Sequence, residues 1–416
     1  MAIQVHHGQG RRLTRHSLPC VLMRAGTSKG LFLHRSDLPK SEAEWPSHLI
    51  SALGSRNNDP RQVDGVGGGT STTSKVAVVS PSSRPDADVD FTFVQVAVGK
   101  ESVDFSGNCG NMSSGVGPFA VQEGLVVPRP GQTEIDVRIF NTNTNRIILE
   151  TLELDETGEY KEDGNYTIPG VKSFGSEVKC SFVHPAGSMT GSLFPSGQKQ
   201  QWLSISPCPP RPHIEPIHVR VTLIDAANPF VLVDSSSISS ILNTLSSPDD
   251  QHQLVESIRL QGAVAMGLAS SLEVAAQTRG TPKIALLRSP ARRTAKATEN
   301  PDIRVRSYSM GLPHPSLQLT GAVCLGAAVS VKGTIAADLA ALEDVDDSLP
   351  PTPERTPSPD INGSHELDDC ARNVLIEHSK GTIPVRVIRR GDDEIASCAV
   401  SRTARRLFEG RVIYYA

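Results

Sequence analysis

The sequence predicts an α/β protein made of two similar domains, each combining short strands with a buried helix. Its 416 residues exceed what one hydrophobic core usually serves, so two domains are the default expectation. Short β-branched runs bounded by Gly, Asn, Asp or Pro recur along the chain, and helical segments are fewer. Three elements of the first half recur in the same order in the second half, which indicates a duplication.

The predicted strands are short, and several alternate between apolar and polar residues, as strands with one solvated face do. In chain order they are "CVLMRAG", "GLFLHR", "KVAVVS", "DFTFVQVAV", "IDVRIFNT", "HVRVTLID", "FVLVD", "KIALLRS", "IRVRSYSM" and "IPVRVIR".

The predicted helices are of two kinds. A helix over 41–55 opens with a capping box from Ser41 to Glu44, and a longer one over 248–272 has acidic residues at its start. Two others, "NMSSGVGPFAV" and "LTGAVCLGAAV", are apolar on every side and are therefore expected to be buried. Pro118 lies inside the first of these and is expected to kink it.

The internal repeat is clearest where "TSKVAVV" (73–79) is matched by "TPKIALL" (281–287), which places Lys75 and Lys283 at the starts of equivalent strands. Upstream, "LMRAGTSKGLFL" is matched by "LIDAANPFVLV", each a strand, a tight turn and a strand. Downstream, the buried helices begin near Cys109 and near Thr320. Duplicated domains most naturally place a site in the cleft between them.

The composition excludes several classes of protein. A net charge of −4 gives no general attraction for nucleic acid or an anionic membrane, and no run approaches the ~18 apolar residues of a membrane span. The seven cysteines are scattered without a CxxC pair, which argues against a zinc site or a disulfide framework and suits a reducing, cytoplasmic location. Residues 1–19 are interpreted as a disordered lead, and the acidic, Pro- and Ser-rich stretch 342–369 as a disordered insertion.

The stretch "DGVGGGTSTTSK" (64–75) is rich in glycine and hydroxyl groups. It is not a Walker phosphate loop, because Ser74 and not glycine precedes Lys75. Its backbone N–H groups and its Ser and Thr hydroxyls can nevertheless surround an anion. An ordinary hairpin loop explains the same residues, and this stretch alone favours that interpretation.

The stretch "GNCGN" places Cys109 between Gly107 and Gly110, directly before a predicted buried helix. At a helix N-terminus the free N–H groups can hold a carboxylate, and the same partial positive charge stabilises a thiolate. A thiol in that position can take or give a proton at carbon. The alternative is a small buried hydrophobe, the common fate of a free cysteine, but the flanking glycines favour a functional role.

Two further turns supply polar candidates. The turn "MRAGTSKG" (23–30) is either a contact for an anion or a solvated hairpin tip. Its counterpart, "SMGLPHPSLQLTG" (309–321), contains His314, which is the natural proton-transfer candidate because the ordinary pKa of histidine lies near neutral pH. A lone histidine beside two prolines is, however, more often structural.

Together these motifs resemble the PrpF family of 2-methylaconitate cis–trans isomerases, aconitate Δ-isomerases and oxalomesaconate tautomerases. The resemblance rests on "RAGTSKGLFL", "GGGTSTTSKVAVV", "FSGNCGNMSSGVGPFAV", "DAANPFVLV", "TPKIALL", "SMG" with "TGAVC", and "SRTARRLFEGRVIYYA". It implies the diaminopimelate-epimerase fold, in which two pseudo-symmetric domains each curl a mostly antiparallel sheet around a central buried helix. We therefore expect domains over 20–205 and 206–403, and a segment over 404–416 that returns to the first domain.

The resemblance also bears on the catalytic residues. In racemases and epimerases of this fold each domain offers one thiol at the N-terminus of its helix. Cys109 fills the first position, but the second, in "SLQLTG", holds no cysteine, and Cys324 lies a turn inside the helix. That departure weakens the interpretation as an amino-acid racemase, and the family pattern implies Lys75 as the partner in proton transfer.

The resemblance implies a cofactor-independent isomerase without a metal site, which shifts the C=C bond of an unsaturated tricarboxylate by a 1,3-proton transfer. We expect cis-aconitate to trans-aconitate, a step toward itaconate, with 2-methylaconitate isomerisation or 4-oxalomesaconate tautomerisation as alternatives. Lys75 is the expected principal acid/base, and Cys109 the second proton carrier or positioning group. The expected substrate contacts are Arg24, Thr27, Ser28, Lys29, Gly69, Thr70, Ser71, Ser74, Asn108, Gly110, Asn111, Met112, Lys283, Ser309, Met310, Gly311, His314, Thr320 and Gly321.

Two points stay open at this level. A non-catalytic tricarboxylate binder, or an accessory protein of an aconitase-like enzyme, is the alternative from another class of function. It is disfavoured because a pure binder has no chemical need for both Lys75 and Cys109. The fold is also compatible with a homodimer, which no surface pattern in the sequence decides.

Overall fold

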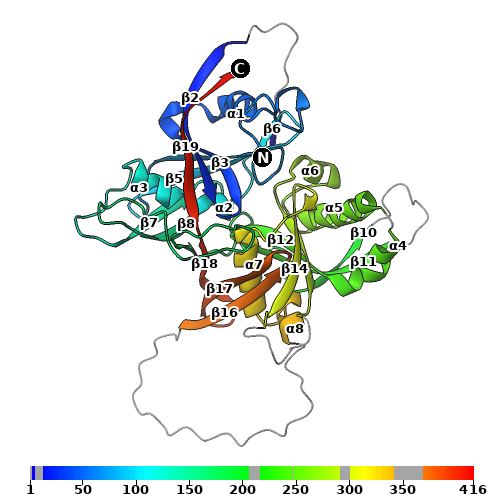
Figure 1. The fold of residues 1–416 in the computed structure, drawn as a ribbon. Helices are drawn as coiled ribbons and strands as arrows, with labels where there is room; N and C mark the ends of the chain where they lie inside the picture. Colours follow the sequence, from blue (N-terminus) through cyan, green and yellow to red (C-terminus); the bar gives the residue numbers. More distant parts are fainter. Residues whose placement is uncertain (1, 5–12, 206–215, 246, 291–299, 342–368) are drawn as a thin grey trace, which may run out of the picture.

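The computed structural model describes residues 2–4, 13–205, 216–245, 247–290, 300–341 and 369–416, and shows two lobes joined along their strands (Figure 1). All the strands in this part of the chain belong to one continuous mixed sheet. The predicted insertion over 342–369 lies outside the described residues except for Asp369, which begins a strand.

The first lobe is formed by the N-terminal half together with the last strand of the chain. Its elements are β1 (Ala2–Gln4), β2 (Arg15–Ala25), β3 (Ser28–His34), η1 (Arg35–Asp37), η2 (Glu42–Glu44), α1 (Trp45–Leu53), η3 (Arg56–Asn58), β4 (Lys75–Pro81), β5 (Val89–Val96), β6 (Ser102–Asp104), α2 (Gly110–Ser113), α3 (Val116–Gln122), β7 (Glu134–Asn141), β8 (Arg146–Glu153), β9 (Val178–Val183) and β19 (Ala404–Tyr415).

The second lobe follows in chain order. Its elements are β10 (Gln201–Ile205), β11 (Ile217–Ala226), β12 (Asn228–Asp234), η4 (Ser235–Ile238), α4 (Ser239–Thr244), α5 (Pro248–Ala265), α6 (Leu272–Gln277), β13 (Lys283–Arg288), β14 (Ile303–Ser309), β15 (Leu312–Pro313), α7 (Leu319–Ser330), α8 (Ile335–Ala341), β16 (Asp369–His378), β17 (Gly381–Arg390) and β18 (Glu394–Arg402).

The strand pairings of the two lobes repeat one another. In the first lobe β2–β3 is antiparallel, β3–β4 parallel, β4–β5 antiparallel, β5–β7 parallel, and β7–β8 and β8–β9 are antiparallel. The second lobe has the same sequence of pairings along β11, β12, β13, β14, β16, β17 and β18. The predicted duplication is therefore confirmed, and each half has a mostly antiparallel sheet.

Each sheet curls around a central helix that is apolar on every side. All the residues of α7 are buried, which is why small residues such as Gly321 and Gly326 alternate with aliphatic ones in its sequence. In the first lobe the equivalent helix is broken into α2 and α3. The break places Pro118 in the first turn of α3, where its missing N–H leaves no hydrogen bond unmade, so the expected conflict with a regular helix does not arise.

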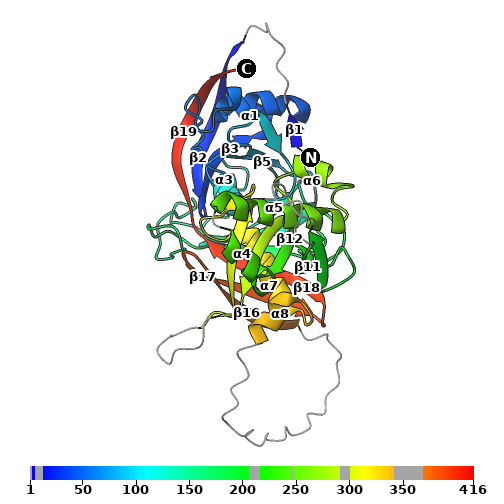
Figure 2. The same ribbon diagram turned by 90° about the vertical axis from the view of Figure 1, so that its right-hand side faces the viewer.

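The outer faces of the two sheets are covered by different helices, as Figure 2 shows for the side of α4, α5 and α6. On the first lobe α1 packs its Trp45 and Leu49 against the sheet. On the second lobe α5 packs Leu254 and Ile258 against β12. A third cluster lies on the inner faces of both sheets and includes α3 and α7, so a single core continues from one lobe to the other.

Two strand pairings tie the lobes together. Strand β18 of the second lobe pairs antiparallel with β9 of the first. The chain then crosses over, and β19 pairs antiparallel with β2 along its whole length, from Ala404 opposite Ala25 to Tyr415 opposite Arg15. The C-terminal segment therefore lies on the first lobe (Figure 1).

Two local expectations were wrong. Ser41 makes no side-chain hydrogen bond to a helix N-terminus, so the capping box does not form; a short 3₁₀ turn, η2, precedes α1 instead. The lead does not extend to residue 19, because Arg15–Pro19 already pair with β19. The strand partner that orders these residues comes from the opposite end of the chain.

No single helix among the described residues is long and apolar enough to cross a membrane. Helices α7 and α8 together meet that criterion by length and composition, but they are bent by 68° to one another.

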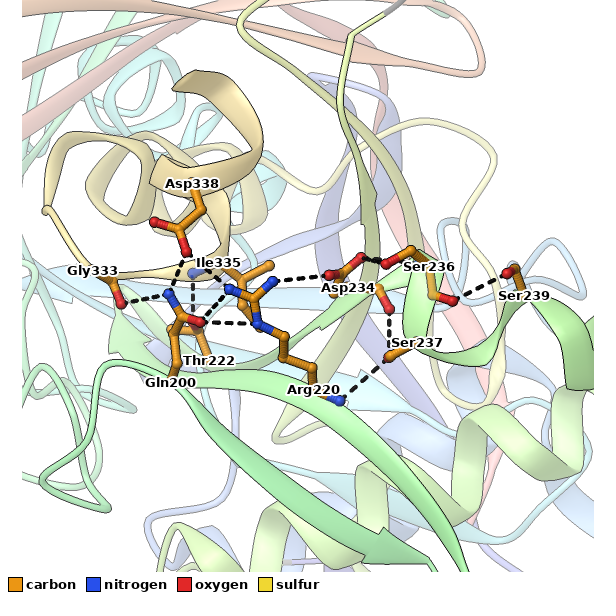
Figure 3. A network of polar contacts seen from close by, with 10 residues as sticks. All are labelled: Gln200, Arg220, Thr222, Asp234, Ser236, Ser237, Ser239, Gly333, Ile335 and Asp338. Atoms are coloured by element: carbon orange, nitrogen blue, oxygen red, sulfur yellow. Dashed lines mark hydrogen bonds and ion pairs between the residues drawn. The ribbon is translucent and has the colours of Figure 1, made fainter. Parts of the chain in front are cut away.

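A polar network fixes the edge of the second lobe around Arg220 of β11 (Figure 3). Its guanidinium donates to Asp234 at 3.2 Å, to Asp338 of α8 at 2.9 Å and to the side-chain oxygen of Gln200. Gln200 in turn donates to Asp338 at 2.7 Å. One cation thus holds β11, β12 and α8 against each other.

Replacing Arg220 by methionine is expected to destabilise this lobe. The substitution leaves Asp234, whose side chain is only 7% exposed, without a cation, and removing one member of a buried pair costs several kcal/mol. Because Arg220 is itself partly exposed, we expect a loss of about 2 kcal/mol. Urea unfolding measures it, with Arg386→Met, an exposed arginine of β17, as the control. Equal midpoints for the two variants would contradict the assignment.

Candidate functional site

A polar cavity lies where the two lobes meet, at the starts of α2 and α7. The two helix starts are in contact, since a Cβ placed on Gly110 would come within 3.0 Å of the backbone nitrogen of Thr320. The cavity is lined by Ser28, Ser71, Thr72, Lys75, Phe93, Gln95, Asp104, Ser106, Asn108, Cys109, Gly110, Asn111, Gly280, Lys283, Ser309, Met310, His314, Gln318 and Thr320.

Asn228 of the second lobe fixes the "GNCGN" loop by two hydrogen bonds to the backbone of Asn108. The backbone N–H of Asn108 donates to Oδ1 of Asn228 at 2.8 Å, and Nδ2 of Asn228 donates back to the carbonyl of Asn108 at 2.7 Å. Gly107 has φ +72°, and a Cβ there would lie 2.7 Å from Oδ1 of Asn228. Only glycine fits this close approach. Cys109 follows as the N-cap residue of α2, half-buried and facing the cavity.

Lys75 reaches the cavity from the first residue of β4. Its Nζ donates to Oε1 of Gln95 at 2.7 Å and lies 4.9 Å from the centre of the Phe93 ring. Gln95 is fixed in turn, because its Nε2 donates to the carbonyl of Ser74 at 2.8 Å. Lys75 as a whole is only 7% exposed. Gln95 and Phe93, which contact its ammonium, both belong to the adjacent strand β5.

Lys283 is the counterpart of Lys75 in the second lobe. Its Nζ donates to the carbonyl of Asn108 and to Oγ1 of Thr320, both at 3.3 Å. Burial lowers the pKa of Lys283 to about 8; the nearby Cys109 acts against this shift, and the charge of Lys75 adds to it. Two lysines, one from each half of the duplication, therefore meet at one cavity, and one of them is substantially neutral just above neutral pH.

His314 lies at the rim of the cavity. The backbone N–H of Ser316 donates to its Nδ1 at 3.2 Å, which leaves the ring proton on Nε2. The pKa of His314 is lowered to about 4, mainly by burial, and the charges of Lys75 and Lys283 act in the same direction. The ring is thus a neutral hydrogen-bond donor over the physiological range and not a base that gains charge there.

Asp104, Ser28 and Ser106 complete the cavity; of these, only Ser28 was among the predicted contacts. Asp104 accepts from the backbone N–H groups of Ser106 at 2.7 Å and Gly280 at 2.9 Å, so it spans both lobes. The hydroxyls of Ser28 and Ser106 are buried without a hydrogen-bond partner. Buried hydroxyls normally find partners, and two unpaired ones facing one cavity indicate a polar ligand.

The second helix start differs from the first. The N-cap residue of α7 is Gln318, where a paired-thiol enzyme would have cysteine. Its side chain is committed to β14, accepting from the hydroxyl of Ser307 and donating to the carbonyl of Tyr308. Cys324 is buried within α7, and burial raises its pKa well above the ordinary value. The inference that Cys109 has no symmetric thiol partner therefore agrees with the geometry.

The structure brings twelve of the predicted site residues to the cavity and leaves nine outside its lining. Arg24 donates to the carbonyl of Thr403 at 2.8 Å and anchors β19, and Ser74 donates to the carbonyl of Val96. Thr27 accepts from Asn111 at 3.0 Å, one layer behind the cavity. The others that do not line it are Lys29, Gly69, Thr70, Met112, Gly311 and Gly321.

Several lining residues were missed by sequence reasoning. Phe93, Gln95 and Asp104 lie in or at the ends of β5 and β6, which had been predicted only as strand or as flanking sequence. No local motif marks them, because the roles of Phe93 and Gln95 depend on the pairing of β5 with β4, and that of Asp104 on its contact with Gly280 of the second lobe. Alternation along "FTFVQV" identifies which of these side chains share a face, but not that the face meets the second lobe.

The cavity is small in this structure. Its free volume is about 30 Å³, room for about one water molecule and far below the ~300 Å³ of a typical ligand pocket. A molecule of several carboxylates therefore requires lining side chains to move aside.

The state of His314 is directly measurable. Its depressed pKa means that the unfolded chain binds the extra proton more readily, so this group contributes stability that is present above about pH 6.5 and lost as the pH falls toward 4. We expect its ring proton signals in NMR to stay unshifted from pH 5.5 to 8, with His314→Gln used to assign them. A midpoint near 6.5 would show that the ring is solvated instead.

Comparison with known proteins now adds to the geometry. Residues 15–347 match the family model described as "PrpF protein". The chain is 33% identical over 408 residues to 3-methylitaconate isomerase of Eubacterium barkeri, covering 95% of this chain and 96% of the relative. It is 34% identical over 338 residues to 2-methyl-aconitate isomerase of Cupriavidus necator, with 76% and 83% covered.

A solved structure agrees with these sequence matches. The crystal structure of a methylitaconate-delta-isomerase superposes with a TM-score of 0.68, at 31% identity and with 96% of each chain covered. The match extends over both lobes, and it confirms the predicted fold class of two similar domains.

Proposed function

Because this chain belongs to the PrpF family, we propose that it is an isomerase that moves the C=C bond of a small unsaturated polycarboxylate by a 1,3-proton transfer. The observation that carries the proposal is the convergence of Lys75, Lys283 and Cys109 on one cavity between the lobes. Relatives named as isomerases of 3-methylitaconate and 2-methyl-aconitate support the reaction type. Within this class we favour cis-aconitate to trans-aconitate, with 2-methylaconitate and 4-oxalomesaconate as the alternatives.

The reaction needs a base, an acid and a stabilised anion. A base removes a proton from the CH₂ group next to a carboxylate, the electrons delocalise into a dienolate, and an acid returns a proton to the far vinyl carbon. Atoms and charge balance without an oxidant or a cofactor. The proton leaves one carbon and a proton returns to another, so the acid and the base must reach two different carbons. Groups that enter the cavity from opposite lobes suit this requirement.

Lys75 is the proposed principal acid/base. It starts a strand, is held by Gln95 and faces the cavity from the first lobe. Lys283 is a second candidate, because burial brings its pKa to about 8 and so supplies the neutral amine that a base requires. Cys109 lines the same cavity, and either moves the second proton or positions a carboxylate.

The dienolate carries charge that the cavity can stabilise. The unpaired hydroxyls of Ser28 and Ser106 and the neutral Nε2–H of His314 are donors that already face it. Preorganised donors of this kind stabilise a developing oxyanion far more than water does. The carboxylate of Asp104 repels the negative charge of the dienolate, but its oxygens accept hydrogen bonds from the backbone N–H groups of Ser106 and Gly280.

The state of the cysteines bears on the location of the protein. The six described cysteines are free, which supports a reducing, cytoplasmic location.

A tricarboxylate binder without turnover is the second candidate, favoured only by the donor-rich cavity. Two lysines converging with a thiol support catalysis over binding alone.

A proton-NMR assay in D₂O tests the function and the substrate together. The protein is incubated separately with cis-aconitate, 2-methylaconitate and 4-oxalomesaconate. We expect isomerisation of cis-aconitate with deuterium appearing at the former vinyl carbon, because the returned proton exchanges with solvent. Turnover of another of the three reassigns the substrate, and binding without any isomerisation establishes the binder instead.

Substitution of the three central side chains separates their roles. Lys75→Ala is expected to lower kcat by about 10²- to 10⁴-fold, the range for losing a general acid–base group, with an unchanged circular dichroism spectrum. If Lys283 is the base that must be neutral, kcat/KM rises with pH through about 8 and Lys283→Ala flattens the profile. Wild-type rates for Lys75→Ala would overturn its assignment.

Cys109→Ser is the matched control for the thiol within the same experiment. A loss of kcat comparable to that of Lys75→Ala identifies Cys109 as a proton carrier. A raised KM with near-normal kcat identifies it as a positioning group, because a hydroxyl keeps the hydrogen bond but not the acidity of a thiol.

A further inference from the structure

A second cavity opens beside the candidate site, along the edge of β14. Its volume is about 450 Å³, within the range of pockets that hold small organic ligands. It is separated from the first cavity by the turn that carries His314, which lines both. The lining residues are Ser235, Leu242, Leu286, Arg288, Arg304, Val305, Arg306, Ser307, Pro313, His314, Ser316, Glu377, His378 and Ser379.

The duplication suggests how this cavity arises, because the equivalent turns of the two lobes differ in length. In the first lobe the turn between β7 and β8 has four residues, 142–145, and its Asn143 fills the gap beside β5. The backbone N–H of Phe93 donates to Asn143 at 2.7 Å, and the amide of Asn143 donates to the carbonyls of Phe93 and Phe105. In the second lobe the equivalent turn, between His378 and Gly381, has only Ser379 and Lys380. It is too short to reach β14, and the gap stays open.

The mouth of this cavity carries an excess of positive charge. Arg288 of β13 lies directly opposite Arg304 of β14, and Arg306 follows on the same face. Like charges directly opposite each other destabilise a sheet. Glu377 pairs with Arg304 at 3.2 Å and offsets one of the three guanidinium groups. Arg306 lies over the ring of Tyr308, and a cation–π contact leaves its charge available to an anion.

Two residues that line the cavity each carry a polar atom without a partner. The Oγ of Ser235 and the Nε2 of His378 are buried without a hydrogen bond, in residues that are 3% and 6% exposed. Nδ1 of His378 accepts from the backbone N–H of Lys380 at 3.1 Å, which leaves the ring proton on Nε2 as a donor. Burial lowers the pKa of His378 to about 4, so this donor is neutral at physiological pH. Unpaired buried donors are costly and point to a ligand.

We propose that this cavity is a second binding site, for a small multivalent anion with carboxylate or phosphate oxygens. Arg288 and Arg306 attract the anion at the mouth, and His378 and Ser235 donate to it inside. Arginine and neutral N–H or O–H donors are the groups that recognise both kinds of oxyanion.

The site is placed to influence the first cavity. The backbone N–H of His314 donates to the carbonyl of Ser307 at 2.8 Å, on the wall of the second cavity. Ser316 lies within 3.3 Å of the Thr27 hydroxyl, which accepts from Asn111 in the first cavity. An anion that orders the turn over 313–316 therefore orders the rim of the candidate site as well.

Isothermal titration calorimetry tests the site without reference to turnover. Citrate and inorganic phosphate are titrated separately into the full-length protein. The test variant is Arg288→Gln with Arg306→Gln. The control is Arg129→Gln with Arg386→Gln, which removes the same charge from exposed arginines elsewhere. A second variant, Lys75→Ala with Lys283→Ala, removes the cations of the first cavity.

We expect at least one of the two anions to bind the wild type, the control and the double-lysine variant alike, and to bind the Arg288/Arg306 variant at least about tenfold more weakly. Whether citrate, phosphate or both bind then assigns the class of anion. His378→Asn, which puts the side chain of the equivalent Asn141 in this position, is expected to weaken binding in the same direction.

Three results would overturn the proposal. Neither anion binds the wild type; or binding is lost only in the double-lysine variant, which places the anion in the first cavity; or the Arg288/Arg306 variant and its control lose affinity equally, which makes the effect one of net charge. The isomerase proposal is untouched by each of these results, since it is tested by turnover.

Discussion

The amide of Asn228 is the interaction on which the rest of the site depends. It belongs to the second lobe, yet both of its polar atoms are bonded to the backbone of Asn108 in the first, and its Nδ2 also lies 3.2 Å from the hydroxyl of Thr320. The pair fixes the loop before Cys109 against the start of α7. Because the amide is fully buried, neither backbone group has water as an alternative partner, and the two lobes are locked in one relative register.

Around this contact the two lobes supply equivalent groups, except that only one of them supplies a thiol. Both lobes start an inner strand with a lysine, and both present a helix N-terminus to the same cavity. The thiol is kept in one lobe and replaced by Gln318 in the other. The departure matters chemically, because two matched thiols suit abstraction and return of a proton at one carbon, whereas an unequal set suits transfer between two carbons.

Burial decides which of these groups can act. Lys283 lies against the backbone of Asn108, and burial lowers its pKa to about 8 although the nearby Cys109 and Asp104 act against the shift. Burial likewise keeps His314 uncharged, because it lowers the pKa of the ring. A cavity with two cationic side chains, one carboxylate and unpaired hydroxyls thus combines attraction for an anion with a base that can lose its proton. The second, more open cavity shares its wall, so the two are coupled through the turn over 313–316.

The sequence by itself determined the duplication, the two buried helices, the lysines at the strand starts and Cys109 at a helix start, since each follows from local pattern. It did not show that Gln95, Asp104 and Asn228 complete the site, because their roles arise from contacts between residues that are 20 or more positions apart, and in two of the three cases more than 100 apart. Nor did it show that the pKa of Lys283 is lowered, or that the two-residue turn between β16 and β17 leaves a cavity open. Those features depend on burial and on distances across the sheet, which only the tertiary structure sets.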